Sequence, residues 1–342
     1  MTNLKSVAAE AGVSVMAVSK ALRDASDISV GTKERIRKIA EQLGYVPNGN
    51  ARGLRNRKSN TIGVVLPRLD QGFFSQILSG ILKSASEVGY QIFICQTDDN
   101  LALELKELRI LLERQVEGIL LAPALRMGGR LEFLEMVTQR NIPVVFLDRF
   151  PANATQFPRT GFVVAQDRLG ASIATEYLIS QGHRDILHLA GPLGASSTEE
   201  RLMGYRKALE KSKVGYRDSL VFRAGSDIEE GRKAMMQVLS EKVSFSSIFA
   251  VNDYVAVGAC EILLSQGIKI PEEVSVVGFG DVRLAKYYRV PLTTIYQGQK
   301  ELGHLSFGML LQMIQGMAVE PRLLPVQLVE RKSVKKIEET VL

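Results

Sequence analysis

The feature that most constrains the fold is an alternation of short apolar runs with amphipathic helical stretches between residues 61 and 278. Strands that are apolar throughout and separated by helices form parallel βαβ units with both sheet faces covered. The alternation occurs twice, so we predict two doubly wound lobes whose strands end at a shared cleft that binds a small molecule. Strands are predicted at 61–67, 90–96, 118–123, 142–148, 162–165, 186–190, 220–223, 247–251 and 274–278, and helices at 74–88, 101–114, 131–139, 169–181, 199–211, 228–240 and 255–266.

The first 45 residues show a different, entirely helical pattern. An Ala-rich helix is predicted at 5–11, Gly12 supplies a left-handed turn residue, and Ser14 can cap a second helix that ends near residue 23. Small inward-facing residues let two helices cross closely, as a helix-turn-helix requires. A third helix is predicted from a Ser29 cap to Leu43. The second helix turns Ala17, Val18, Ala21 and Leu22 inward and Val15, Met16, Ser19, Lys20 and Arg23 outward.

The excess of positive over negative charge is confined to the same end of the chain. Residues 1–60 hold eleven Lys and Arg against five acidic residues, which accounts for the whole net charge of +6 of the 342 residues. The remainder is neutral. An ordinary helical hairpin with a solvated basic surface would not explain this segregation, which is the footprint of a nucleic-acid module joined to a neutral body.

A short basic segment, residues 50–58, links these two parts and carries one large apolar residue, Leu54. As a free helix it would be marginal, because it is short and Gly49 and Gly53 each disfavour helix by about 1 kcal/mol. The segment is therefore either a disordered linker or a helix that forms only against DNA. In the second case Leu54 would be a wedge between base pairs of the minor groove.

Several classes of chemistry lack their sequence signatures. There is no GxGxxG after a strand, no GxxxxGK[ST] and no GxSxG, and the three histidines have no metal-ligand spacing. Cys95 and Cys260 lie in apolar runs typical of core residues in a reducing cytoplasm. No secretion signal or long apolar run predicts export or a membrane span. We expect a cytoplasmic ligand-binding body that is not an enzyme, with no cofactor and no metal.

Motifs along nearly the whole chain resemble the lactose/galactose-repressor family of bacterial transcription regulators. The matching segments are VAAEAGVSVMAVSKALRD, ISVGTKERIRKIAEQLGYVPN, ARGLR, TIGVVLP, IPVVFLDR, EYLISQGHRDILHLAGP, ERLMGYRKAL, FAVNDYVAVGACEIL, IPEEVSVVGFGDV and PLTTI. The resemblance implies an N-terminal all-α helix-turn-helix domain and an α/β body of two doubly wound parallel-sheet lobes, like periplasmic binding proteins. It divides the chain into a DNA-binding domain 1–47, a hinge 48–60, an N-lobe 61–164 with 295–323, and a C-lobe 165–294 with 324–342.

The resemblance also implies a homodimer that reads a pseudo-palindromic operator, with the second helix in the major groove. Paired hinge helices would place Leu54 of each subunit in the minor groove. Many members carry Arg at the position of Lys20, and Lys cannot offer guanine the same planar fork. The implied base-reading residues are Val15, Met16 and Lys20, and further DNA contacts are assigned to Ser6, Ser14, Ser19, Asn48 and Arg52.

For the cleft, the resemblance implies a small carbohydrate-type effector. Two departures concern acidic positions of the family: Gln166-Asp167 stands where Asp-Asn is common, and Gly280-Asp281 where Asp-Asp is common. With Arg149 and Arg201 retained, these departures predict a positive cleft and hence a sugar acid or sugar phosphate. Asp148 and Asp253 could be ligand contacts or structural caps. The implied effector residues are Phe73, Phe74, Arg149, Gln166, Arg201, Asn252 and Gly280.

Effector binding would change the angle between the lobes and thereby form or melt the hinge helices. The sequence leaves open whether the effector releases DNA or promotes binding. The alternative function is a cytoplasmic sugar-binding or sugar-modifying protein that does not act on DNA. The charged N-terminal module argues against that alternative.

Overall fold

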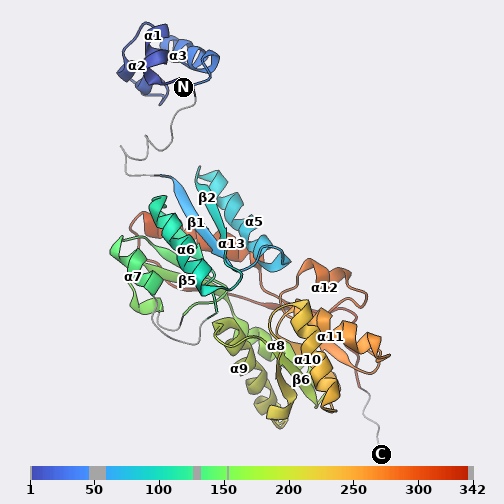
Figure 1. The fold of residues 1–342 in the computed structure, drawn as a ribbon. Coiled ribbons are helices and arrows are strands. Elements are labelled where there is room, and N and C mark those ends of the chain that lie inside the picture. Colours follow the sequence, from blue (N-terminus) through green and yellow to red (C-terminus); the bar gives the residue numbers. More distant parts are fainter. Residues whose placement is uncertain (1, 46–58, 126–131, 152–153, 338–342) are drawn as a thin grey trace, which may run out of the picture. The chain divides into compact units, whose positions relative to one another are not determined.

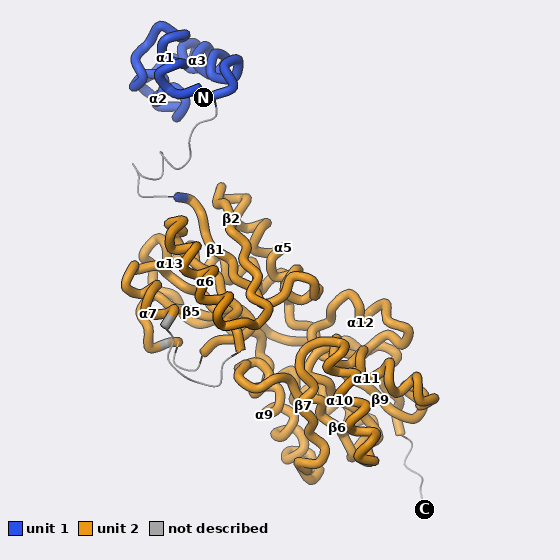
Figure 2. The backbone as a smooth tube through the Cα atoms, in the orientation of Figure 1, with its two compact units in different colours: residues 1–59 blue, residues 60–342 orange. Residues whose placement is uncertain are grey.

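A computed structural model describes residues 2–45, 59–125, 132–151 and 154–337. The chain divides into two compact units, residues 1–59 and 60–342 (Figure 2). Each unit has its own hydrophobic core.

The first unit contains three helices around a small apolar core (Figure 1). The predicted caps are confirmed: Ser14 Oγ accepts from the Ala17 amide at 3.1 Å, and Ser29 Oγ accepts from the Thr32 amide at 3.4 Å. Gly12 has the left-handed φ of +62° that the turn between the first two helices requires. The helices are α1 (Leu4–Glu10), α2 (Val15–Ala21) and α3 (Val30–Gln42), and their fully buried residues include Val7, Val18, Ala21 and Ile36.

The N-lobe of the second unit is built on a parallel sheet of order β11-β5-β4-β3-β1-β2. Helices α5 and α13 pack on one face and α6 and α7 on the other, so the central strands are apolar on both sides. The strands are β1 (Thr61–Leu66), β2 (Gln91–Gln96), β3 (Gly118–Leu121), β4 (Val144–Leu147), β5 (Thr160–Ala165) and β11 (Arg322–Leu324). The helices are α5 (Gly72–Glu87), α6 (Leu101–Glu113), α7 (Glu132–Gln139), α13 (Gln299–Ile314) and the 3₁₀ turn η1 (Ala154–Gln156).

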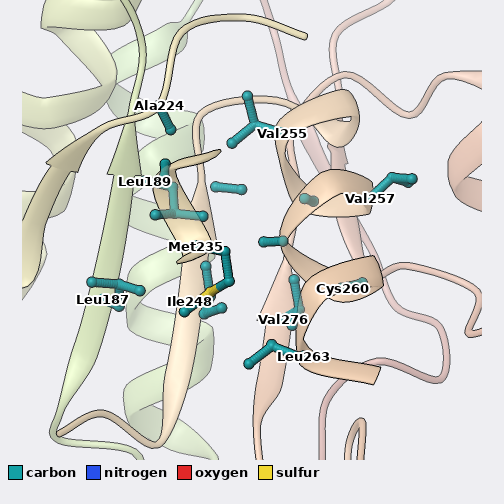
Figure 3. Close-up of a cluster of buried hydrophobic side chains, with 14 of the residues drawn as sticks. Leu187, Leu189, Ala224, Met235, Ile248, Val255, Val257, Cys260, Leu263 and Val276 are labelled. Atoms are coloured by element: carbon teal, nitrogen blue, oxygen red, sulfur yellow. The ribbon is translucent and has the colours of Figure 1, made fainter. Parts of the chain in front are cut away.

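The C-lobe has a parallel sheet of order β7-β6-β8-β9. Helices α10 and α11 cover the face shown in Figure 3, where Leu189, Met235 and Ile248 pack together. Helices α8 and α9 cover the other face. The strands are β6 (Ile186–Ala190), β7 (Val221–Arg223), β8 (Ser247–Ala250) and β9 (Ser275–Val277). The helices are α8 (Asp167–Ser180), α9 (Ser196–Lys211), α10 (Ile228–Ser240), α11 (Asp253–Ser265), α12 (Arg283–Tyr287) and the 3₁₀ turn η2 (Asp218–Leu220).

The chain passes between the two sheets between β5 and α8, between β10 and α13, and between β11 and β12. Strand β10 (Thr294–Tyr296) pairs antiparallel with β12 (Gln327–Val329), and both pack near α8. These elements confirm the predicted fold class of a helix-turn-helix module with two parallel α/β lobes. The carboxyl ends of the parallel strands of both lobes lie at one cleft.

Glycines set the closest helix contacts in the second unit. A Cβ on Gly80 of α5 would lie 2.1 Å from the Lys300 carbonyl oxygen, and one on Gly303 of α13 would lie 2.1 Å from the Ile77 carbonyl oxygen. Gly258 of α11 makes a similar approach to α10, where the Ile228 carbonyl oxygen would be 2.2 Å from its Cβ. These helix pairs pack backbone against backbone, which no other residue type permits.

Candidate nucleic-acid interface and ligand cleft

Helix α2 has one face in the core and one face open, as its sequence pattern predicts. Val18 and Ala21 are fully buried, whereas Met16 is 65% and Val15 40% exposed. Nothing within the unit requires large apolar side chains on the open face. They are suited to apolar contact with a partner such as a thymine methyl.

The polar residues near α2 already have local hydrogen-bond partners. The Ser14 hydroxyl is occupied as the α2 cap, and Ser6 Oγ donates to Asn3 Oδ1 at 3.3 Å. The Lys20 amine forms an ion pair with Asp27, which holds the pKa of the Asp27 carboxyl below its usual range. Sequence analysis missed this pair, because the partners are seven residues apart across a loop. Ser19, also a predicted DNA contact, lies in α2 and is partly buried. Asn48, Arg52 and Leu54, the three remaining predicted DNA contacts, lie outside the described residues.

The cleft between the lobes holds a pocket of about 700 Å³, including its open mouth. It combines aromatic faces with polar and charged groups, the usual composition of a small-molecule site. Its N-lobe lining is Pro67, Arg68, Gln71, Phe73, Phe74, Asp99, Asp148 and Arg149. Its C-lobe and crossover lining is Pro192, Ser197, Thr198, Arg201, Gly225, Ser226, Val251, Asn252, Tyr254, Phe279, Val282 and Gln297.

Arg201, in the second turn of α9, is buried, and its guanidinium contacts three partners. Its Nε donates to Asp167 Oδ1 at 2.8 Å, its Nη2 lies 2.7 Å from the same oxygen, and its Nη1 donates to the Val251 carbonyl at 2.7 Å. The guanidinium also lies 3.9 Å from the centroid of the Phe279 ring. This geometry fixes the side chain against the cleft wall.

Arg149 follows β4 on the opposite lobe and is equally buried. Its Nε donates to the Pro123 carbonyl at 2.7 Å, and its Nη2 is paired with Asp99. Both cleft arginines therefore have a carboxylate partner. The prediction of a positive cleft took no account of these partners, because the sequence pattern could not show Asp99 and Asp167 reaching these two side chains.

Asp148 and Asp253, which the sequence leaves as either ligand contacts or structural caps, have different surroundings. Asp253 Oδ2 accepts from the Val282 amide at 2.9 Å and its Oδ1 accepts from Thr294 Oγ1 at 2.6 Å, so it ties the start of α11 to β10. Asp253 is not among the lining residues of the cleft, and its role is structural. Asp148 lines the cleft with a left-handed φ of +61°. Burial raises the pKa of its carboxyl, and Arg201 and Arg149 oppose that shift.

Of the predicted effector residues, five line the pocket: Phe73, Phe74, Arg149, Arg201 and Asn252. Gln166 and Gly280 are not among the lining residues. Sequence analysis missed Gln297, whose side chain is buried and lines the pocket. Its Nε2 has no hydrogen-bond partner within the described residues, and an unpaired buried donor that faces a pocket calls for an acceptor atom on a ligand. Its position in the sequence, directly before Gly298, carries no signal of this role.

Hydrogen bonds also join the two lobes across the cleft. Arg68 Nη1 donates to Asp227 at 3.2 Å, and the Phe150 amide donates to Ser196 Oγ at 3.0 Å. The Gly72 amide donates to the Tyr254 hydroxyl at 2.5 Å. The bonds of Arg68 and Gly72 connect the segment at the start of α5 with the starts of α10 and α11, and the bond of Phe150 connects the segment after β4 with the start of α9.

Two family descriptions together match nearly the whole chain. Residues 3–48 match the bacterial regulatory proteins of the lacI family, and residues 59–335 match the periplasmic binding proteins and sugar binding domain of the LacI family. The chain belongs to the LacI family of transcriptional regulators. This membership makes it a DNA-binding repressor with an effector-binding body and not an enzyme.

Relatives of this LacI-family chain match it over its full length. The HTH-type transcriptional repressor PurR of Vibrio atlanticus is 30% identical over 342 residues, covering 98% of this chain and 100% of that protein. PurR of Yersinia pestis is 31% identical, covering 98% and 97%. The lac repressor dimer bound to operator and the anti-inducer ONPF superposes with a TM-score of 0.86 at 30% identity, covering 98% and 99%. The CelR–cellobiose complex has a TM-score of 0.74 at 27% identity, covering 97% and 100%.

Within the described ranges there is no group of three or more His, Cys, Asp or Glu side chains placed to hold a metal ion. Among the same residues, no helix combines the length and apolar character needed to cross a bilayer.

Proposed function

We propose that this protein acts in the bacterial cytoplasm as a homodimer that binds a pseudo-palindromic operator and represses transcription under the control of a carbohydrate-type effector. The DNA-binding part of this proposal rests on one observation. Helix α2 has an exposed apolar face, and it belongs to the unit that holds all of the net positive charge. Positive charge supplies affinity for the phosphate backbone, and exposed side chains on one helix supply base recognition. The proposed domains are those predicted from the sequence, with a hinge at 48–60.

In this proposal α2 enters the major groove. Val15 and Met16 contact thymine methyl groups, and Lys20 contacts a guanine edge after leaving Asp27. The hydroxyls of Ser6, Ser14 and Ser19, together with Asn48 and Arg52, contact the backbone. Leu54 of each subunit enters the minor groove from a hinge helix.

The composition of the cleft supports a small hydroxylated effector. Phe73 and Phe74 form an edge-to-face pair, with ring centroids 5.1 Å apart, that can cover an apolar ring face. Gln297 Nε2 offers a donor, Asp148 offers acceptors, and the Ser197 hydroxyl borders the same space. Alternating donors and acceptors around a ring-sized pocket are what a sugar requires.

The coupling between effector binding and DNA binding follows from the contacts that join the two lobes. An effector that favours one lobe angle shifts the separation of the N-lobes in the dimer, and the hinge helices form only when these are close. The sign of control depends on which lobe angle the effector prefers.

The test is fluorescence anisotropy with DNA upstream of the gene that encodes the protein. We expect nanomolar, sequence-specific binding whose log affinity falls linearly with log salt, by about 0.9 per phosphate contacted. Competitor DNA of scrambled sequence should be far weaker. A purified protein that binds no duplex specifically, with or without sugars, would overturn the proposal and favour a sugar-binding protein without DNA function.

A further inference from the structure

A row of alternating charges crosses the cleft. It runs from Asp99 to Arg149 on the N-lobe, through Asp148, to Arg201 and Asp167 on the C-lobe. The two outer carboxylates are in direct ion pairs with the two arginines, and Asp148 interacts electrostatically with both guanidiniums. Three carboxylates therefore face these two arginines, and Arg68, the third arginine of the pocket lining, is paired with Asp70 and Asp227.

The ion pair on the C-lobe is almost completely withdrawn from solvent. The side chains of Arg201 and Asp167 are 7% and 5% exposed, so water screens their charges little. An anionic ligand group that approached Arg201 would have to compete with Asp167, whose Oδ1 already accepts from Nε and lies 2.7 Å from Nη2 of that guanidinium. Displacing Asp167 would leave a buried carboxylate without a partner, which is strongly unfavourable.

The ion pair on the N-lobe has the same arrangement with a less buried acid. Asp99 is 22% exposed at its side chain and lines the pocket, so its charge is presented directly to a ligand. The two pairs come from different lobes and share no residue. Each pair can therefore be altered by a substitution that leaves the residues of the other pair in place.

We propose that Asp99 and Asp167 are specificity-determining residues that cancel the charge of the two cleft arginines and restrict the effector to uncharged polyhydroxylated compounds. This inference rests on the proposed carbohydrate-type effector and names its charge class. It replaces the sugar acid or sugar phosphate expected from the sequence. A hydroxyl group can still accept from an arginine N–H that is oriented by its carboxylate, whereas a carboxylate or phosphate meets a site without net attraction.

The test uses Asp99→Asn and Asp167→Asn in the full-length protein. Asparagine keeps a side-chain oxygen that can accept from the arginine but removes the negative charge, so each change frees one guanidinium charge. Asp185→Asn is the matched control, since Asp185 is paired with Arg217 on the surface of the C-lobe, outside the pocket. Urea unfolding and operator binding show that each variant is folded.

Isothermal titration then compares uncharged sugars with their charged counterparts: glucose, glucuronate and glucose 6-phosphate, and galactose with galacturonate. We expect wild type to prefer an uncharged member by at least a hundredfold. Either cleft variant should reduce that preference by at least tenfold, and Asp185→Asn should leave it unchanged. A wild type that binds the acids as tightly as the neutral sugars would overturn the inference while leaving the proposed function standing.

A second comparison distinguishes failure of the proposed carbohydrate effector from failure of the charge argument. If no sugar of any charge binds wild type, the carbohydrate effector of the proposed function fails. The charge argument is then judged with glucuronate and inorganic phosphate alone, which should bind Asp167→Asn or Asp99→Asn measurably and wild type not at all. Folded variants that gain no anion affinity would overturn it.

Discussion

Replacement of Gly303 by alanine tests whether α5 and α13 pack as closely as the structure shows. The new methyl group would lie 2.1 Å from the Ile77 carbonyl oxygen, whereas C–H···O contacts occur at about 3.3 Å or more. Since the obstacle is the backbone of another helix, the two helices must separate by about 1 Å. Overpacking of this kind costs about 1–3 kcal/mol and sometimes more, and the helix propensity of alanine returns about 1 kcal/mol.

Gly308 provides the matched control on the same helix. A Cβ at this position meets nothing within 4 Å, so Gly308→Ala gains the propensity term without a clash. We expect Gly308→Ala to raise the free energy of unfolding by up to about 1 kcal/mol and Gly303→Ala to lower it by about 1 kcal/mol, or more where the overpacking cost is larger. Urea unfolding followed by circular dichroism measures both. If Gly303→Ala proved as stable as Gly308→Ala, the close backbone approach described here would be incorrect.

Three further predictions concern DNA binding and pH. Leu54→Ala should weaken specific operator binding far more than non-specific binding; an equal loss in an anisotropy assay would refute the minor-groove wedge. Asp27→Asn should tighten operator binding a few-fold more than Asp24→Asn, which removes the same charge but is paired with Lys33 and Arg37, because only Asp27 competes with DNA for Lys20. Burial lowers the pKa of His188 to about 4, so its neutral form contributes stability above pH 6.5 that is lost as pH falls toward 4. This loss is at most about 3 kcal/mol, and it should be absent from urea titrations of His188→Phe.

The sequence allowed elements with strong local signals to be predicted. Ser14 and Ser29 marked helix starts because their hydroxyls bond backbone amides three residues later, and both bonds are present. The central strands were predictable because burial on both faces demands a continuous apolar run. Strand β7 begins at Val221 instead of the predicted residue 220, because Leu220 belongs to a 3₁₀ turn.

Elements that depend on contacts with residues far away in the sequence could not be predicted from local patterns. Strands β10 and β12 have three residues each and exist because they pair across more than thirty residues of chain. Helix α12 has five residues, too few for a periodic pattern. The same limit applies to the cleft: Asp167 is 34 residues from Arg201 and Asp99 is 50 from Arg149, so only the fold reveals that the charges cancel.

The contacts between the lobes determine how much binding free energy an effector needs in order to change the lobe angle. The bonds from Arg68 to Asp227, from Gly72 to Tyr254 and from Phe150 to Ser196 are partly solvent-accessible, and each such hydrogen bond contributes about 1 kcal/mol. A ligand needs only a differential affinity of a few kcal/mol to rebalance an equilibrium held by forces of this size. Arg68 itself lines the pocket, and Gly72 at the start of α5 and Phe150 after β4 directly follow the lining residues Gln71 and Arg149. A ligand that moves those elements therefore acts directly on the bonds that fix the lobe angle.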